Sequence, residues 1–193
     1  MALPINIESL LSGSAVESNQ LEYKEGWNPD TIYRSICAFA NDFEDTGGGY
    51  IIVGVKEEHG HAVRPVLGVN PDSIEQIEKD MVGYNNLIRP YYQPRLFIEE
   101  IDRKTILVIK VTAGERRPYK VPDRITAKQK DFNYYIRYNS SSIVPKDEYE
   151  RELINLANRT PFDDRGNDQI SLRDISTALL RDFLVDVGSD LAD

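Results

Sequence analysis

Residues 37–58 read CAFANDFEDTGGGYIIVGVKEE, and this stretch indicates how the chain folds. It begins as the apolar end of a helix, passes through an acidic turn and breaks at three glycines, Gly47 to Gly49. The segment that follows is apolar and rich in β-branched residues without alternation, which is typical of a strand buried on both faces. We therefore expect a helix, a glycine turn and a central strand over residues 50–55.

Other segments on both sides of this stretch also alternate between helix and strand patterns. Asn28-Pro29-Asp30 is a helix start, because the Asn side chain can cap the helix and proline needs no backbone partner there. The pattern predicts an α+β (α/β) fold in which a mixed β-sheet is flanked by helices, with a further helix near the C-terminus. The expected helices are residues 6–11, 28–43, 74–88, 146–158 and 172–187, and the expected strands are residues 20–24, 50–55, 61–68, 95–101, 105–112 and 132–138.

The composition excludes several classes of protein. The chain has 193 residues, of which 40% are hydrophobic, so it can bury a substantial core. No apolar run approaches the roughly 20 residues of a membrane span, and the N-terminus lacks the pattern of a secretion signal. The single cysteine, Cys37, excludes an internal disulfide and, with only two histidines, a Cys/His zinc site. A cytoplasmic protein is therefore expected, with Cys37 packed in the core.

Charge is distributed unevenly along the chain. The net charge is −9, yet residues 103–137 hold ten basic and three acidic residues, a local charge of +7. Aromatic residues are interleaved with these cations, a combination that suits single-stranded nucleic acid, where bases stack on rings and cations bind phosphates. A solvated hairpin face is the alternative interpretation. The predicted contacts are Arg116, Arg117, Lys120, Arg124, Tyr135 and Arg137.

Within this basic segment, the expected strand over residues 132–138 decides which rings are available. Phe132, Tyr134, Ile136 and Tyr138 alternate as an inward strand face does, so Tyr135 and Arg137 are expected to point outward. Under this interpretation, Tyr135 is the stacking platform and Arg137 binds phosphate.

The glycine turn does not have the spacing of a nucleotide-binding loop. Neither G-x-x-x-x-G-K-[ST] nor G-x-G-x-x-G occurs in the chain. Those loops also lie between a strand and a helix N-terminus, whereas here the order is helix, glycines, strand. We therefore expect no ATP binding by this segment alone.

Glu22-Tyr23-Lys24 is a second motif, whose residue types are suited to catalysis. Alternate strand residues share a face, so a carboxylate and an ammonium project together, as in many metal-dependent nucleases. Glu17 and Glu57 are candidates to complete a three-carboxylate site for Mg²⁺ or Mn²⁺, with Lys24 as an electrostatic helper. An ordinary exposed strand with paired Glu and Lys is the alternative interpretation.

Several motifs in order resemble a known family, the Schlafen AlbA-like domain. They are Glu17-Ser18 with Leu21-Glu22-Tyr23-Lys24, Ala38-Phe39-Ala40-Asn41, Gly48-Gly49-Tyr50-Ile51-Ile52-Val53-Gly54-Val55, Arg117-Pro118-Tyr119, and Tyr134-Tyr135-Ile136-Arg137 with Ser140-Ser141. The resemblance covers roughly residues 14–157. It implies a Schlafen AlbA-like fold and nucleic-acid binding, in bacteria as the N-terminal domain of transcriptional regulators or RecG-related, ATP-binding helicase proteins.

The resemblance also implies an alternative activity, because some Schlafen proteins are metal-dependent endoribonucleases with three acidic residues. Glu17 and Glu22 match the first two positions, but Glu57 stands where the family usually has Asp. One extra methylene displaces a metal ligand by about an ångström, on the order of what costs a hundredfold in rate.

Three functional hypotheses follow for an expected domain of residues 1–160 and an acidic linker with a helix over residues 161–193. The first is binding of DNA or RNA by a transcriptional regulator or RecG-related protein, and the second is the endoribonuclease. The third is a protein-interaction or oligomerisation domain. The apolar stripe of residues 172–187 could dock back, form a homo-oligomer or begin a following domain.

Overall fold

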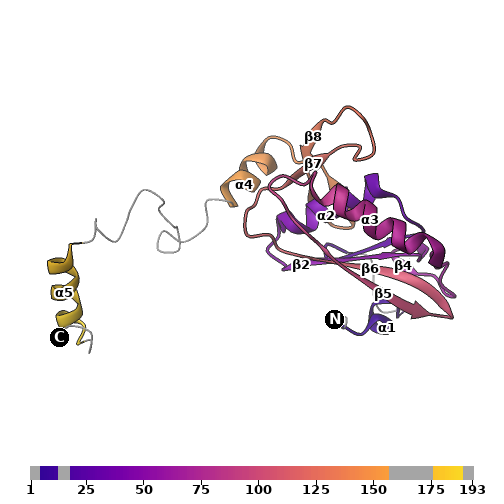
Figure 1. The fold of residues 1–193 in the computed structure, drawn as a ribbon, viewed down its shortest axis with the longest axis horizontal. Coiled ribbons are helices and arrows are strands. Elements are labelled where there is room, and N and C mark those ends of the chain that lie inside the picture. Colours follow the sequence, from indigo (N-terminus) through magenta and orange to yellow (C-terminus); the bar gives the residue numbers. More distant parts are fainter. Residues whose placement is uncertain (1–4, 13–17, 157–175, 189–193) are drawn as a thin grey trace. The chain divides into compact units, whose positions relative to one another are not determined.

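The computed structural model describes residues 5–12, 18–156 and 176–188. The chain divides into two compact units, residues 1–159 and 160–193. Unit 2 contains one described helix, α5 (Thr177–Asp186). No helix of the described residues is both long and apolar enough to span a membrane. Unit 1 is a mixed sheet with helices on both sides (Figure 1), which confirms the expected α+β class.

The main sheet of unit 1 has the strand order β1-β2-β6-β5. β1 runs parallel to β2, while the β2–β6 and β6–β5 pairs are antiparallel, so the sheet is mixed as expected. Its strands are β1 (Leu21–Lys24), β2 (Gly48–Val53), β5 (Arg95–Ile101) and β6 (Lys104–Thr112).

Smaller two-stranded ladders and the helices complete unit 1. The ladders are β3 (Glu57–Glu58) with β4 (His61–Ala62), β7 (Lys120–Pro122) with β8 (Phe132–Tyr134), and β9 (Ile136–Tyr138) with β10 (Ser141–Ile143). The helices are α1 (Ile7–Leu10), α2 (Pro29–Asn41), the 3₁₀ turn η1 (Pro71–Ser73), α3 (Ile74–Asn85) and α4 (Glu148–Leu156).

The central strand β2 is buried on both faces, as its sequence predicts. Ile51 and Val53 pack in the larger core under α2 and α3, whereas Ile52 packs in a second core on the side of α1 (Figure 1). α2 begins as predicted, with the Asn28 side chain accepting a hydrogen bond from the amide of Thr31 at 3.4 Å. The continuous apolar run therefore places β2 between two cores, and α2 covers one of them.

Two segments differ from the sequence-based expectation. The strand expected over residues 61–68 is reduced to the two residues of β4, because Pro65 has no amide hydrogen to continue a ladder. The strand expected over residues 132–138 is divided at Tyr135 into β8 and β9, which pair with different strands. The second difference changes the functional interpretation.

At the start of β2, the glycine backbone packs so closely against β6 that it leaves no room for a side chain. Gly48 has φ +92°, and a Cβ atom there would lie 2.2 Å from the carbonyl oxygen of Val111. We expect Gly48→Ala to lower the free energy of unfolding by about 2 kcal/mol or more, as measured by urea denaturation.

The matched control is Gly83→Ala within α3, where a Cβ would meet nothing within 4 Å. This variant should raise the free energy of unfolding by about 0.5–1 kcal/mol, because alanine favours the helix. Equal effects of the two variants would contradict the packing described for β2 and β6.

Candidate functional site

The C-terminal end of α2 holds the basic segment against the core. The Asn41 amide nitrogen donates to the carbonyl oxygens of Tyr119 at 2.9 Å and Tyr135 at 2.8 Å, and its oxygen accepts from the Tyr119 amide at 2.6 Å. The thiol of Cys37 also contacts the Tyr119 carbonyl oxygen, at 3.1 Å. Burial raises the pKa of Cys37 to about 12, so this thiol stays neutral and packs in the core, as predicted.

The N-terminal half of α2 holds the same segment at a second place. The Arg34 guanidinium donates to the carbonyl oxygen of Asp123 at 2.7 and 3.0 Å, and also forms an ion pair with its carboxylate at 3.1 Å. The Asp30 carboxylate accepts from the amide of Thr126 at 3.0 Å. Residues 119–126 therefore follow α2 along its length, with polar contacts at both ends.

Three of the predicted phosphate contacts are available at the surface to differing degrees. Arg116 and Arg124 are exposed. Arg117 is half-buried and lies 3.8 Å from the Asp42 carboxylate, with a hydrogen bond to the Asp42 carbonyl oxygen at 3.2 Å. Arg117 therefore stabilises the end of α2, and part of its charge is compensated within the protein.

The expected outward orientation of Tyr135 and Arg137 is wrong. Tyr135 is 3% exposed and Arg137 is 4% exposed. The reason is the division of the strand at Tyr135, since a change of ladder partner interrupts the alternation of faces. Burial and the hydrogen bond to Asp123 raise the pKa of the Tyr135 phenol to about 12.

Of the three carboxylates expected in a metal site, the structure describes two, Glu22 and Glu57, and each already accepts hydrogen bonds within the protein. Glu22 is buried and accepts from both Arg137 and Lys24, so the predicted Glu22–Lys24 pair does share a face. Glu57 is the first residue of β3, and its carboxylate accepts from the amide of Gly60 in the turn that follows. Glu17 lies outside the described residues.

A divalent cation at Glu22 would have to compete with two cationic side chains that already bind its carboxylate. Across residues 5–12, 18–156 and 176–188, no three His, Cys, Asp or Glu side chains are grouped for metal binding. Because Glu17 lies outside the described residues, the three-carboxylate site for Mg²⁺ or Mn²⁺ stays a prediction.

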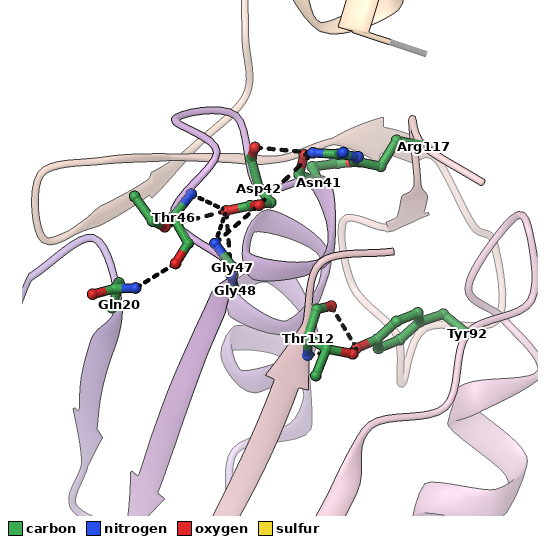
Figure 2. A network of polar contacts seen from close by, with 9 residues as sticks. All are labelled: Gln20, Asn41, Asp42, Thr46, Gly47, Gly48, Tyr92, Thr112 and Arg117. Carbon is green, nitrogen blue, oxygen red and sulfur yellow. Dashed lines mark hydrogen bonds and ion pairs between the residues drawn. The ribbon is translucent and has the colours of Figure 1, made fainter. Parts of the chain in front are cut away.

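The glycine turn already binds an anion of the protein itself. Figure 2 shows the Asp42 carboxylate accepting hydrogen bonds from the amides of Thr46 at 2.9 Å, Gly47 at 3.1 Å and Gly48 at 3.2 Å. Successive amides that converge on one anion are a common phosphate-binding arrangement in proteins. Here a phosphate would have to displace Asp42, which also carries the Arg117 ion pair.

A surface of paired cations and rings lies on the β7–β8 ladder. The Arg89 guanidinium carbon is 4.1 Å from the centre of the Phe132 ring, and the Lys120 ammonium is 5.9 Å from the centre of the Tyr134 ring. Backbone hydrogen bonds of 2.9 and 2.8 Å join Arg89 to Lys120, and Lys120 is opposite Tyr134 in the ladder. We call these four residues the cation–ring platform.

Among the described residues, the two cations of the platform lack the ion pairs that other basic side chains form. Neither Arg89 nor Lys120 has an ion-pair partner among the described residues, in contrast to Arg117 and Arg137. Arg89 is exposed, while Lys120 and both rings are half-buried. The alternation predicted that Phe132 and Tyr134 face inward, but both rings are only partly buried. The rings orient the cations by cation–π attraction and leave their outer sides in solvent.

A groove of about 460 Å³ is lined by residues that are close in sequence to Arg89 and Lys120. It is lined by Tyr91, which is 59% exposed, by Arg116, and by neighbouring residues of both segments. Tyr91 is two residues after Arg89, and Tyr119 in the groove immediately precedes Lys120. Sequence reasoning missed Arg89 and Tyr91, because both lie outside the basic segment and only the fold brings Arg89 to Lys120.

The buried ion pair between Glu22 and Arg137 can be tested by stability. Glu22→Gln leaves the Arg137 guanidinium buried without its anion, so we expect the free energy of unfolding to fall by about 3–5 kcal/mol. Urea denaturation measures this change. In the double variant Glu22→Gln/Arg137→Met, most of the loss should be recovered, because the buried guanidinium is gone and the remaining partner of Glu22, Lys24, is partly exposed to solvent. A single variant as stable as the wild type would contradict the burial of this pair.

Comparisons with known proteins place this fold in a family. The family model of the Schlafen AlbA_2 domain matches residues 17–146. A comparison with curated proteins gives no match. Among solved structures, the DIP2311 protein from Corynebacterium diphtheriae has a TM-score of 0.52 at 16% identity, and the alignment covers 90% of this chain and 36% of that one.

The N-terminal domain of a RecG-related protein from Nitrosomonas europaea has a TM-score of 0.44 at 22% identity, with 74% of this chain and 83% of that one covered. The likeness to DIP2311 supports the fold, and this chain spans little more than a third of that protein. Because the family model covers more than half of its residues, the chain belongs to the Schlafen AlbA_2 family.

Proposed function

We propose that this domain binds nucleic acid, with DNA as the principal ligand, through the cation–ring platform of Arg89, Lys120, Phe132 and Tyr134. The observation that carries the proposal is the pair of cations held over rings, neither of which has a carboxylate partner in the described part of the chain. An acidic protein repels polyanions over most of its surface, so such an uncompensated site concentrates the attraction. Membership of the Schlafen AlbA_2 family supports the same function.

The platform suits a sugar–phosphate backbone followed by unpaired bases. Arg89 and Lys120 supply charge for two phosphates, and their rings restrict the side-chain freedom that binding would otherwise remove. Tyr91 and Arg116 in the groove offer an exposed ring and a further cation, although Glu115 also lines the groove. This arrangement favours single strands, because their unpaired bases are free to stack on aromatic side chains.

We further propose that this binding serves a larger cytoplasmic protein, a transcriptional regulator or a RecG-related protein. Support comes from the family and from the length of DIP2311, of which this chain spans 36%. Any ATP-dependent activity of such a protein would then reside outside the described glycine turn, whose amides bind Asp42.

The salt dependence of binding tests the proposal. The affinity of the full chain for a fluorescent single-stranded oligonucleotide should fall as salt rises, with a log–log slope of about −0.7 per phosphate contact. Each of Arg89→Ala and Lys120→Ala should weaken binding and reduce the slope by about one contact. Fluorescence anisotropy at several salt concentrations measures both quantities.

The matched control is Lys56→Ala, which removes a partly exposed lysine just before the β3–β4 hairpin that is already paired with Glu58. This variant should bind as the wild type does. Binding without salt dependence, or equal losses in Lys56→Ala and Lys120→Ala, would contradict a specific role for the platform. Comparison with duplex DNA and with RNA of the same sequence identifies the preferred ligand.

A further inference from the structure

One long edge of the main sheet is formed by β5. Its inner side pairs without interruption with β6, from Arg95 opposite Lys110 to Ile101 opposite Lys104. No other described strand pairs with its outer side, and β5 lies at the margin of the sheet in Figure 1. An unpaired edge of this kind presents backbone donors and acceptors that can bind another strand.

Charged side chains often protect an edge, but β5 carries both signs, Arg95 together with Glu99 and Glu100, so two antiparallel copies can attract each other. Edge strands are commonly protected by proline, by a bulge or by shortness, and the seven residues of β5 contain no proline and no bulge. The apolar Ile98 is 47% exposed at its centre. The opposite edge, β1, has only four residues.

We propose that β5 pairs antiparallel with β5 of a second copy of this chain, about a two-fold axis through Phe97. In this register Phe97 lies opposite its own counterpart, Arg95 lies opposite Glu99, and Leu96 lies opposite Ile98. Every pair joins residues of one sheet face, since odd positions share the side of Phe97 and even positions the other. The two sheets become one continuous sheet.

The charges of β5 select this register over the next one. An axis through Ile98 would place Phe97 opposite Glu99 and Leu96 opposite Glu100, with apolar side chains against carboxylates. The axis through Phe97 instead gives two Arg95–Glu99 pairs and two apolar Leu96–Ile98 pairs. Opposite charges and apolar pairs directly across antiparallel strands are both stabilising. The two-fold symmetry doubles each contact.

The expected dimer is weak, because five residues of each strand overlap. Such an interface is smaller than the standard size of stable complexes, about 1,600 Å². The surface is formed by different residues from the cation–ring platform, so the inference does not depend on nucleic-acid binding.

Sedimentation equilibrium of the full chain, without nucleic acid, tests the proposal between about 1 μM and 1 mM. The wild type should show a reversible monomer–dimer equilibrium. Glu99→Arg should weaken dimerisation by at least about tenfold, because two attractive pairs become repulsive. The exchange variant Arg95→Glu/Glu99→Arg should restore it. Circular dichroism confirms that each variant is folded.

Glu100→Arg is the matched control, since it makes the same charge change one residue away, outside the five-residue overlap. It should dimerise as the wild type does. A wild-type chain that stays monomeric over the whole range would overturn the proposal. A dimer that Glu99→Arg and Glu100→Arg weaken equally would also overturn it, and would indicate another surface.

Discussion

The side-chain amide of Asn41 connects the core to the surface that carries the proposed function. It is fully buried. Its nitrogen donates to the carbonyl oxygens of Tyr119 and Tyr135, and its oxygen accepts from the Tyr119 amide. Tyr119 precedes β7, and Tyr135 separates β8 from β9. One side chain thus fixes the position of both strands of the platform, and no other residue type offers the same donors and acceptor at this length.

Asp42, the next residue, stabilises the other side of the same helix end. Its carboxylate binds the amides of the glycine turn, which gives the chain a short connection from α2 into the central strand β2. Arg117 compensates part of this charge. The end of α2 therefore organises both the entrance to the core strand and the start of the basic segment.

The local charge of the basic segment divides into structural and surface parts. The ammonium of Lys130 donates to the carbonyl oxygens of Ile125 and Ala127, at 2.8 and 2.6 Å, and so closes its own loop. Arg137 is buried against Glu22, and Arg117 is half-buried beside Asp42. Only part of the +7 charge is thus available for a ligand, and a count of cations overstates the surface. Arg89, from outside the segment, replaces some of that charge.

The sequence predicts the features that depend on local patterns. The apolar run of β2, the cap of α2 and the strands expected over residues 95–101 and 105–112 all depend on neighbouring residues, and the structure confirms them. The orientation of Tyr135 and Arg137 was wrong, because it depends on which strand each half of residues 132–138 pairs with. Arg89 could not be predicted, because its contact with Phe132 joins residues far apart in the chain.

Amide hydrogen exchange of Tyr119 in the variant Asn41→Leu tests most directly whether Asn41 holds the platform. Leucine fills a similar volume but accepts no hydrogen bond, so the Tyr119 amide should exchange at least about tenfold faster than in the wild type. The amides of the β5–β6 hairpin should keep their relative protection, and oligonucleotide affinity should fall. A Tyr119 amide as protected as in the wild type would contradict the account.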